Sequence, residues 1–332
     1  MTVDNENTPV LIEAGAVKRQ ASRTNLSYGL LILLSQLCGT GLDLLVRAAA
    51  PELRMLSAYR FLLSGVSFYL IGGILLALTL RKIPAAAPEK QSVSAKELII
   101  YIVMAWGLMM VGNILGNLTN SLLGALTGHS SSNYVASSIM GSSLLPTFIF
   151  AVITGPVFEE IFFRKLLCDR FGIAGGIAAS VMSGLIFGLF HGNLYQFFYA
   201  FLIGALMAQL YVRTGKLRYT IIIHMAVNFL GSFLPMLLIQ RTGLDLNALT
   251  SGTITQEQLP ALAVYGVFAI LQYALAITGI VLLVTRIKTL AWQVPGWRVE
   301  KGSRLNTLVL NTGGVFLLAV SVAIMAYTFL AA

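Results

Sequence analysis

Charged side chains are scarce in this chain. Asp, Glu, Lys and Arg make up only 11% of its 332 residues, whereas a soluble domain carries about 25%. Hydrophobic residues account for 57%, and the mean hydropathy is +0.83. A soluble globule with this composition would expose large apolar patches and aggregate. The shortage of charge therefore excludes a soluble globular fold and predicts a polytopic membrane protein.

Cysteine is nearly absent as well. The two cysteines, Cys38 and Cys168, lie in or beside apolar segments and lack metal-site spacing. Two such thiols suggest neither a disulfide framework nor a zinc cluster. We expect both to be small, buried hydrophobic side chains.

Three kinds of signal are also missing. No glycine-rich phosphate loop follows a strand pattern, which removes ATP-driven transport from the leading candidates. No internal repeat is visible, although secondary transporters often contain one. No cleavable signal peptide is recognisable, because the first 26 residues are polar and place Lys18, Arg19 and Arg23 before the first apolar run. We expect this segment to be a cytoplasmic tail.

The sequence does contain a series of nine apolar runs. Each is about long enough to cross a ~30 Å hydrocarbon layer as a helix, and only helices satisfy their own backbone groups in lipid. We therefore predict an all-α transmembrane bundle of about nine spans, at residues 27–46, 58–80, 98–118, 143–163, 173–190, 194–212, 219–239, 261–285 and 305–330. Polar interruptions of these runs concentrate in residues 143–240, which we therefore expect to form the functional core. The other parts are a tail at 1–26, N-terminal scaffold spans at 27–142 and C-terminal spans at 241–332.

Lysine and arginine fall mainly on alternate connections between these runs. One set of connections holds 18 of the 22 basic residues, and the other holds Arg47, Arg54, Arg60 and Arg241. Because cytoplasmic loops carry the excess of Lys and Arg, the alternation predicts an inside N-terminus and an outside C-terminus. The net charge of +9 is then a topology signal, and no nucleic-acid partner is expected. Asp43 and Arg47, four residues apart, are expected to form a local ion pair.

The first polar cluster is a pair of carboxylates, Glu159 and Glu160, late in the run 143–163. Pro156 precedes them, and a proline kink in a membrane helix needs neighbours that satisfy the freed carbonyl group. Glu160 can pair with Arg164, four residues on, while Glu159 points about 100° away. One carboxylate would then be structural and the other chemical. The alternative is that both lie at the cytosolic interface, solvated beside Arg164 and Lys165.

Two further clusters contain two of the three histidines of the chain. Phe187 and His191 share one helical stripe with two glycines, which allow another helix to approach closely. His224 and Asn228, four residues apart, interrupt an apolar run. Interhelical hydrogen bonding alone would also explain either cluster.

Together these residues supply what the hydrolysis of an amide requires. A carboxylate or imidazole base activates water, and donors stabilise the oxyanion. Counting 1.5 Å per residue along straight helices nevertheless separates the clusters. His191 falls at the end of its span far from the cytosol, whereas Glu159 lies only ~7 Å from Arg164, which marks the cytosolic end of the fourth span. The clusters meet only if the fourth span extends past Arg164 or if residues 170–176 enter the bundle.

The three clusters, in this order, resemble the motifs of the CPBP intramembrane protease family. They read Glu159-Glu160-Ile-Phe-Phe-Arg164, Phe187-Gly-Leu-Phe-His191 and His224-Met-Ala-Val-Asn228. The family includes type II CAAX prenyl endopeptidases and Abi bacteriocin-immunity proteins, and the resemblance covers about residues 143–240. It implies an all-helical fold with a cavity open towards the cytosol. It also implies that Glu159 is the general base with His191 as its partner, that His224 and Asn228 hold the oxyanion, and that Glu160, Arg164 and Phe187 support them.

Proteins of this family have also been called metalloproteases. The sequence lacks a His-Glu-x-x-His helix, which argues against a zinc site of that kind. Glu159, His191 and His224 would be the ligands if zinc were bound, with water as the fourth. We favour metal-free chemistry, with no cofactor, over the zinc alternative.

Three functions remain open on the sequence alone. The favoured one is an intramembrane endopeptidase that cuts a membrane-bound or lipidated, for example prenylated, peptide near its C-terminus, with the lipid bilayer as its surroundings. The alternatives are a non-catalytic bacteriocin self-immunity or scaffold protein, and a transporter with a carboxylate proton relay. If the protein is an enzyme, Glu159→Gln should abolish cleavage while the protein still folds. If it is a scaffold, the same substitution should leave its function intact.

Overall fold

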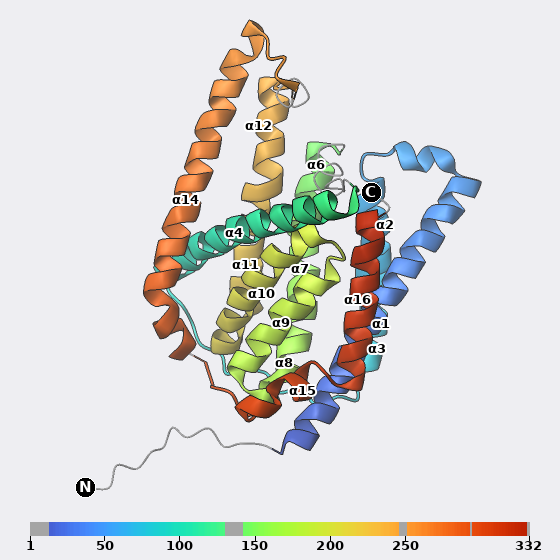
Figure 1. The fold of residues 1–332 in the computed structure, drawn as a ribbon, viewed down its shortest axis with the longest axis vertical. Helices are drawn as coiled ribbons and strands as arrows, with labels where there is room; N and C mark the ends of the chain where they lie inside the picture. The colour runs from blue at the N-terminus through green and yellow to red at the C-terminus, as the bar shows by residue number, and fades with distance from the viewer. Residues whose placement is uncertain (1–12, 130–141, 246–250, 293, 331–332) are drawn as a thin grey trace.

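The computed structural model describes residues 13–129, 142–245, 251–292 and 294–330, and these residues form helices and connecting loops with no strand. The predicted all-α class is therefore confirmed (Figure 1). Eight helices of the described chain are long and apolar enough to cross a membrane, and one further apolar helix is shorter. Each of the nine predicted runs has a helix, but only eight of these helices are long enough to span, so the predicted count of about nine spans is not confirmed.

The chain order of the helices follows the predicted runs. The N-terminal part contains α1 (Ala14–Ala49), η1 (Pro51–Met55), α2 (Tyr59–Ser64), η2 (Gly65–Ile71), α3 (Gly72–Leu80) and α4 (Ala95–Thr127). The fourth span contains α6 (Leu144–Pro146), η3 (Thr147–Thr154), α7 (Gly155–Glu160), η4 (Ile161–Leu166), α8 (Leu167–Phe171) and η5 (Gly172–Ala174). The rest contains α9 (Gly176–Phe190), α10 (Leu194–Thr214), α11 (Leu217–Asn228), η6 (Phe229–Phe233), α12 (Leu234–Thr242), α14 (Leu259–Trp292), α15 (Arg304–Leu308) and α16 (Thr312–Leu330).

Two hydrophobic cores hold the bundle together. One packs α1, α3, α8, α9 and α16 around residues such as Tyr28 and Phe187. The other packs α4, α10, α11 and α14 around Met104 and Ile223. The antiparallel helices α9 and α10 contact each other extensively and join the two cores at the centre of Figure 1.

The fourth span is longer than predicted. It runs without a break from Leu144 to Ala174 and continues well past Arg164. Arg164, which was expected at the cytosolic end, is fully buried, as is Glu160. The alternative of two solvated carboxylates is therefore wrong, and the extended fourth span is the arrangement observed. Of the basic residues that suggested an early end, Arg164 and Arg170 are buried and donate to Ser183 and to the Leu80 carbonyl on other helices, whereas Lys165 is 44% exposed.

Helix α9 is too short to cross a bilayer. Its 15 residues cover about 22 Å, against ~30 Å of hydrocarbon. It begins at Gly175, whose φ of +104° favours glycine. The Gly176 N–H then donates to the Pro295 carbonyl at 2.8 Å. The helix ends at His191, so this turn between α9 and α10 lies within the bundle.

The glycine stripe of α9 makes the close approach that was predicted. A Cβ atom on Gly184 would lie 2.6 Å from the Phe201 carbonyl oxygen, and one on Gly188 would lie 2.8 Å from that of Phe197. Both carbonyls belong to α10. Substituting either glycine would push the two helices apart.

Most basic connections gather at one end of the bundle, which we call the basic end. Backbone hydrogen bonds there join Ala86 to Asp169, Gln91 to Thr214, and Arg298 to Ala174, at 2.8–2.9 Å. It is the lower end of Figure 1. The four remaining arginines lie on α1, η1, α2 and α12 at the opposite end. This separation agrees with the alternation in the sequence, and the membrane side of each end stays a prediction.

Two smaller predictions have mixed outcomes. Asp43 and Arg47 form the expected ion pair at 2.7 Å. Both cysteines are free, and Cys168 is buried as expected, whereas Cys38 is only half-buried. Cys38 is more accessible because it lies on the part of α1 whose side chains are largely exposed.

Candidate active site

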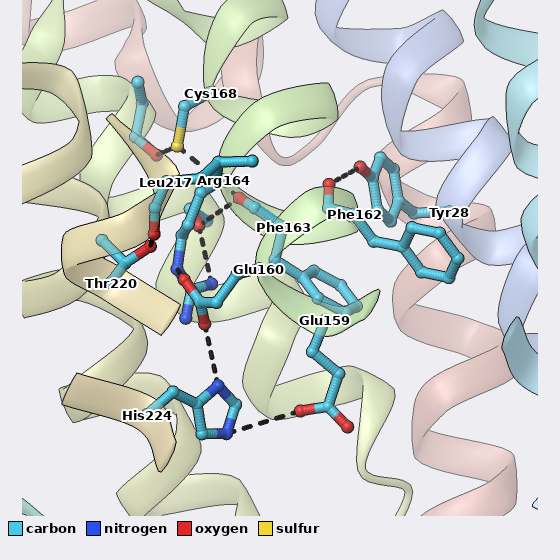
Figure 2. A network of polar contacts seen from close by, with 12 residues as sticks. Tyr28, Glu159, Glu160, Phe162, Phe163, Arg164, Cys168, Leu217, Thr220 and His224 are labelled. Carbon is cyan, nitrogen blue, oxygen red and sulfur yellow. Dashed lines mark hydrogen bonds and ion pairs between the residues drawn. The ribbon is translucent and has the colours of Figure 1, made fainter. Parts of the chain in front are cut away.

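A buried ion pair lies at the centre of the candidate site (Figure 2). The Nε atom of Arg164 lies 2.9 Å from Oε2 of Glu160, and both side chains are fully buried. Arg164 also donates to Ser183 Oγ at 3.3 Å and covers the ring of Phe187 at 4.7 Å. A buried charge is tolerated when it is paired and hydrogen-bonded in this way. The predicted pairing of Glu160 with Arg164 is confirmed, and it leaves Glu160 committed to structure.

His224 lies between the two carboxylates, as Figure 2 shows. Its Nδ1 lies 2.9 Å from Glu160 Oε1, and its Nε2 lies 3.6 Å from Glu159 Oε2. An ionised carboxylate only accepts hydrogen bonds, so the partners assign the Nδ1 proton to the bond with Glu160. The Nε2 atom is then an acceptor in the neutral ring and a donor in the imidazolium. Glu160 thus fixes the orientation of the ring that faces Glu159.

Glu159 has a different environment from its neighbour. Its side chain is 13% exposed, whereas that of Glu160 is 0% exposed. Its Oε1 accepts a hydrogen bond from the Tyr69 hydroxyl at 2.7 Å. No cation in the described chain pairs with Glu159 except His224 when protonated. Glu159 is therefore the carboxylate that remains available for chemistry.

Tyr69 is a site residue that the sequence did not reveal. It lies on η2, and its ring stacks on Phe158 with centroids 5.2 Å apart and planes 5° apart. We had expected the spans before residue 143 to act only as scaffold. The Tyr69 hydroxyl is one of five in the run 58–80, so the sequence does not single it out or predict a partner 90 residues away.

His191 faces the cluster from the turn that follows α9. Its Nδ1 lies 2.8 Å from the Phe187 carbonyl oxygen, which can only accept, so Nδ1 carries a proton. In the neutral ring Nε2 is then free to accept one. The Phe187 ring lies 4.8 Å from the His191 ring and 5.7 Å from the His224 ring, centroid to centroid. The Phe187 ring therefore contacts both histidine rings and the Arg164 guanidinium group. Within the described residues, no hydrogen bond joins His191 to Glu159.

Asn228 satisfies a backbone group of the kinked span. Its amide donates to the Ala151 carbonyl at 2.8 Å. Ala151 lies in η3, a π-helical segment in which each carbonyl accepts from the residue five positions on. That residue is Pro156, which has no N–H. The expected rescue of a freed carbonyl by a neighbour is therefore observed, and the second amide hydrogen of Asn228 remains for the predicted oxyanion role.

The predicted zinc ligands do not form a ready-made site. Within the described residues, no group of three His, Cys, Asp or Glu side chains could hold a metal ion. The Nδ1 atoms of His191 and His224 bond to a carbonyl and a carboxylate, and both Nε2 atoms stay open, as in histidines that ligate a metal. The metal-free mechanism and the zinc alternative both stay predictions, and the mechanism proposed below is the metal-free one.

A cavity of about 800 Å³ reaches His191. Its walls come from α1, α2, η2, α16 and the turn between α9 and α10, and it extends towards Arg47, Arg54 and Arg60. That is the end of the bundle opposite the basic end. The Lys and Arg distribution assigns this end to the outside, whereas the family resemblance predicts a cavity open to the cytosol. If this cavity is the one that the resemblance implies, only one of the two predictions can hold, and both stay predictions.

Residues 141–230 match the family model described as Type II CAAX prenyl endopeptidase Rce1-like. This region contains all three clusters and is less than a third of the chain. Searches of the curated proteins and of the solved structures found no match. Residues 141–230 are therefore similar to the CPBP/CAAX protease family. The eight apolar helices, of which Leu144–Ala174 and Leu194–Thr214 lie within the match, indicate an integral, multi-pass membrane protein.

Proposed function

We propose that this protein is an intramembrane endopeptidase that hydrolyses a peptide bond near the C-terminus of a membrane-associated, lipidated peptide. The observation that carries the proposal is the unequal environment of the two adjacent carboxylates. Glu160 is fully buried and bound to Arg164, whereas Glu159 is partly accessible and, among the described residues, accepts a hydrogen bond only from neutral Tyr69. A structural role alone would not require a second, unneutralised carboxylate at this depth.

Glu159 acts as the general base in this mechanism. It takes a proton from a water molecule, whose oxygen attacks the carbonyl carbon of the scissile bond. His191, with its Nδ1 bound to the Phe187 carbonyl, presents Nε2 as a second acceptor that orients the water. Glu159 then passes its proton to the leaving nitrogen as the C–N bond breaks. The other proton of the water stays on the new carboxylic acid. The products are this acid and an amine, which become a carboxylate and an ammonium group after proton exchange, so that atoms and charges balance.

Two donors would stabilise the oxyanion of the tetrahedral intermediate. In its imidazolium form His224 keeps Nδ1–H on Glu160 and has Nε2–H left for the substrate oxygen. The Asn228 amide keeps one hydrogen on Ala151 and has the other left. Donors that are fixed by the fold before the reaction give the largest stabilisation. The ion pair of Glu160 with Arg164 serves this purpose by fixing His224.

The direct test is cleavage of a C-terminal peptide by the full-length protein in detergent. The substrates are a farnesylated Cys-aliphatic-aliphatic-X peptide and its unmodified counterpart. We expect Glu159→Gln and His191→Ala each to lower kcat by at least about 100-fold, the usual contribution of a general base. Glu89→Gln, on an exposed loop at the basic end, is the matched control and should retain activity. Thermal unfolding shows whether each variant is folded.

The same assay separates the alternatives. Cleavage that survives Glu159→Gln in a folded protein would contradict the proposal. A folded wild type that cleaves neither peptide but binds them would favour an immunity or scaffold protein. Loss of activity with a chelator, restored by added zinc, would overturn the metal-free mechanism.

The side of the membrane that the cavity faces needs its own test. In a Cys38→Ser background, Glu52→Cys and Lys90→Cys place single thiols at the two ends, while Cys168 stays buried. From the Lys and Arg distribution we expect an impermeant maleimide to label only Glu52→Cys in intact cells. The cavity then faces outwards, and the substrate is an exported peptide. Labelling of Lys90→Cys alone would turn the cavity to the cytosol, where prenylated proteins are found.

A further inference from the structure

A chain of hydrogen bonds runs from the His191 turn into helix α10. Asn193 caps the start of this helix, because its Oδ1 accepts a hydrogen bond from the Gln196 backbone N–H at 3.0 Å. Its Nδ2 donates to the His191 carbonyl at 2.9 Å and to Gln196 Oε1 at 2.8 Å. Gln196 Nε2 donates in turn to the Tyr199 hydroxyl oxygen at 2.6 Å. The chain therefore connects the backbone at His191 with a phenol group.

A backbone donor fixes the direction of every hydrogen bond in this chain. The Gln196 N–H can only donate, so the Asn193 atom that faces it must be the amide oxygen. The Asn193 amide nitrogen then points at Gln196, which must present its own oxygen there and its nitrogen to Tyr199. Because that nitrogen can only donate, the Tyr199 oxygen accepts, and its own hydrogen is left over. Among the described residues, no group accepts that hydrogen.

The Tyr199 ring is held in place beside His191. It packs against both hydrophobic cores, and Gly112 of α4 leaves no room for a Cβ atom against the Tyr199 backbone. The centroids of the Tyr199 and His191 rings lie 6.3 Å apart, with their planes at 71°. The Glu159 carboxylate is near enough to act electrostatically on the Tyr199 hydroxyl. The unused hydrogen thus belongs to a fixed ring near both groups that act on water in the proposed mechanism.

Both of those groups are hydrogen-bond acceptors. Glu159 takes one hydrogen of the water, and Nε2 of the neutral His191 ring takes the other. The water still has two lone pairs, of which one must face the carbonyl carbon of the scissile bond. A donor to the other lone pair would fix the orientation of the water before the reaction. Neither Glu159 nor a neutral His191 with Nδ1 bound to a carbonyl can supply such a donor.

We propose that Tyr199 is a further catalytic residue, which donates its hydroxyl hydrogen to the attacking water and directs the remaining lone pair at the scissile carbonyl. Asn193 and Gln196 are positioning residues that act through Tyr199, because they keep its hydrogen free for the water. Tyr199 retains its proton throughout, so the balance of the reaction is unchanged. This proposal rests on the proposed protease function, and it adds the donor that sets the direction of attack.

The first test measures peptide cleavage by variants of the full-length protein in detergent. Tyr199→Phe removes the donor and should lower kcat about tenfold with little change in KM, because the water takes part in the chemical step and not in substrate binding. Gln196→Glu keeps a hydrogen bond to Tyr199 but reverses it, since a carboxylate only accepts. The phenol hydrogen then points away from the water, and kcat should fall by a similar factor. Tyr211→Phe removes a buried hydroxyl that bonds to Asp169 on the same helix α10, and should keep the wild-type kcat.

The double variant Tyr199→Phe/Gln196→Glu separates the hydrogen bond from the added charge. If Gln196→Glu acts only by accepting the phenol hydrogen, the double variant should be no slower than either single variant. Losses of kcat that multiply would show that the added charge slows the reaction by itself, and would overturn the positioning role of Gln196. An unchanged kcat in folded Tyr199→Phe would overturn the whole proposal.

A crystal or electron-microscopy structure that resolves water tests the proposal without any cleavage. Wild type should bind one water within about 3.2 Å of Glu159, of His191 Nε2 and of the Tyr199 hydroxyl, and Tyr199→Phe should lose or displace it. If this water is present although no peptide is cleaved, the protease function fails and the water site of Tyr199 stands. If wild type cleaves the peptide but its Tyr199 hydroxyl bonds to no such water, the protease function stands and the role of Tyr199 is overturned.

Discussion

Two ion pairs in this chain have the same four-residue spacing and opposite surroundings. Glu160 and Arg164 are fully buried, whereas the side chains of Asp43 and Arg47 are 19% and 54% exposed. The joined N and O atoms are almost equally close, at 2.9 and 2.7 Å. Spacing on a helix predicts both pairs equally well. It does not predict how much each pair contributes to the free energy of unfolding or to the function of the protein.

The surroundings decide that contribution. The buried pair is tied to Ser183, Phe187 and His224, and removing one partner would leave a charge without water or counter-ion. The exposed pair can exchange its partner for solvent or for a ligand. The buried pair can therefore hold a reactive group in a fixed orientation, whereas the exposed pair is free to change its partners. Of the four substitutions below, Arg164→Met and Arg47→Gln test this contrast directly, and Asn228→Ala and Tyr69→Phe add two neutral hydrogen bonds of intermediate burial.

The largest effect is expected from Arg164→Met. It leaves Glu160 buried and unpaired, which costs about 3–5 kcal/mol in comparable cases. Thermal or denaturant unfolding in detergent measures the loss. The double variant Glu160→Gln/Arg164→Met removes both charges and should recover at least half of it. A single variant that unfolds like wild type would show that the pair is not desolvated.

Asn228→Ala should have the next largest effect. It leaves the Ala151 carbonyl of the π-helical segment without its donor, and a buried unsatisfied carbonyl costs about 1–3 kcal/mol. Asn117→Ala, which removes an exposed amide on α4, is the control and should change the unfolding free energy much less. If Asn228 also donates a hydrogen bond to the oxyanion, kcat should fall by more than the loss of folded protein explains. Equal stability of the two variants would contradict the assigned hydrogen bond.

Tyr69→Phe should lower stability by about 1 kcal/mol, the usual net contribution of one hydrogen bond. Its effect on activity is larger, about tenfold in kcat, because Glu159 loses the contact that orients it. Tyr273→Phe, on a side chain that is 57% exposed, is the matched control. Unchanged kcat in Tyr69→Phe would mean that the hydroxyl only fills space.

Arg47→Gln should have the smallest effect on stability, between about 0 and 1 kcal/mol. Because salt screens exposed charges, the difference from wild type should shrink between low and high ionic strength. The effect of Arg164→Met should not respond to salt. A salt-independent loss of several kcal/mol in Arg47→Gln would remove the contrast between the two pairs.

The local parts of the site were predictable from the sequence. Helical spacing predicted the pair of Glu160 with Arg164 and the close approach of the α9 glycines to α10. The proline at 156 predicted a carbonyl in need of a donor. Each of these depends on residues within one or two turns of a helix, where the geometry is fixed by the backbone.

The parts that were missed depend on distant residues. The basic residues Arg164, Lys165 and Arg170 predict a cytosolic connection, and therefore an early end of the fourth span. Arg170 instead donates to the Leu80 carbonyl at 2.9 Å, and Asp169, which accepts from Tyr211 at 2.8 Å, also pairs with Lys165. Tyr69 was missed for the same reason. Spacing within one helix contains no information about which other helix will supply a partner.

The short helix α9 has a consequence for insertions and deletions. The contact of Gly176 with Pro295 fixes one end of the helix, and His191 follows the other end. One added residue between them would shift the imidazole by about 1.5 Å and rotate it by about 100°. All three motifs would still be readable in such a chain, yet the ring would no longer face Glu159. In this helix the number of residues matters as much as their identity, and the C-terminal segment that contains Pro295 supplies the reference point from which they are counted.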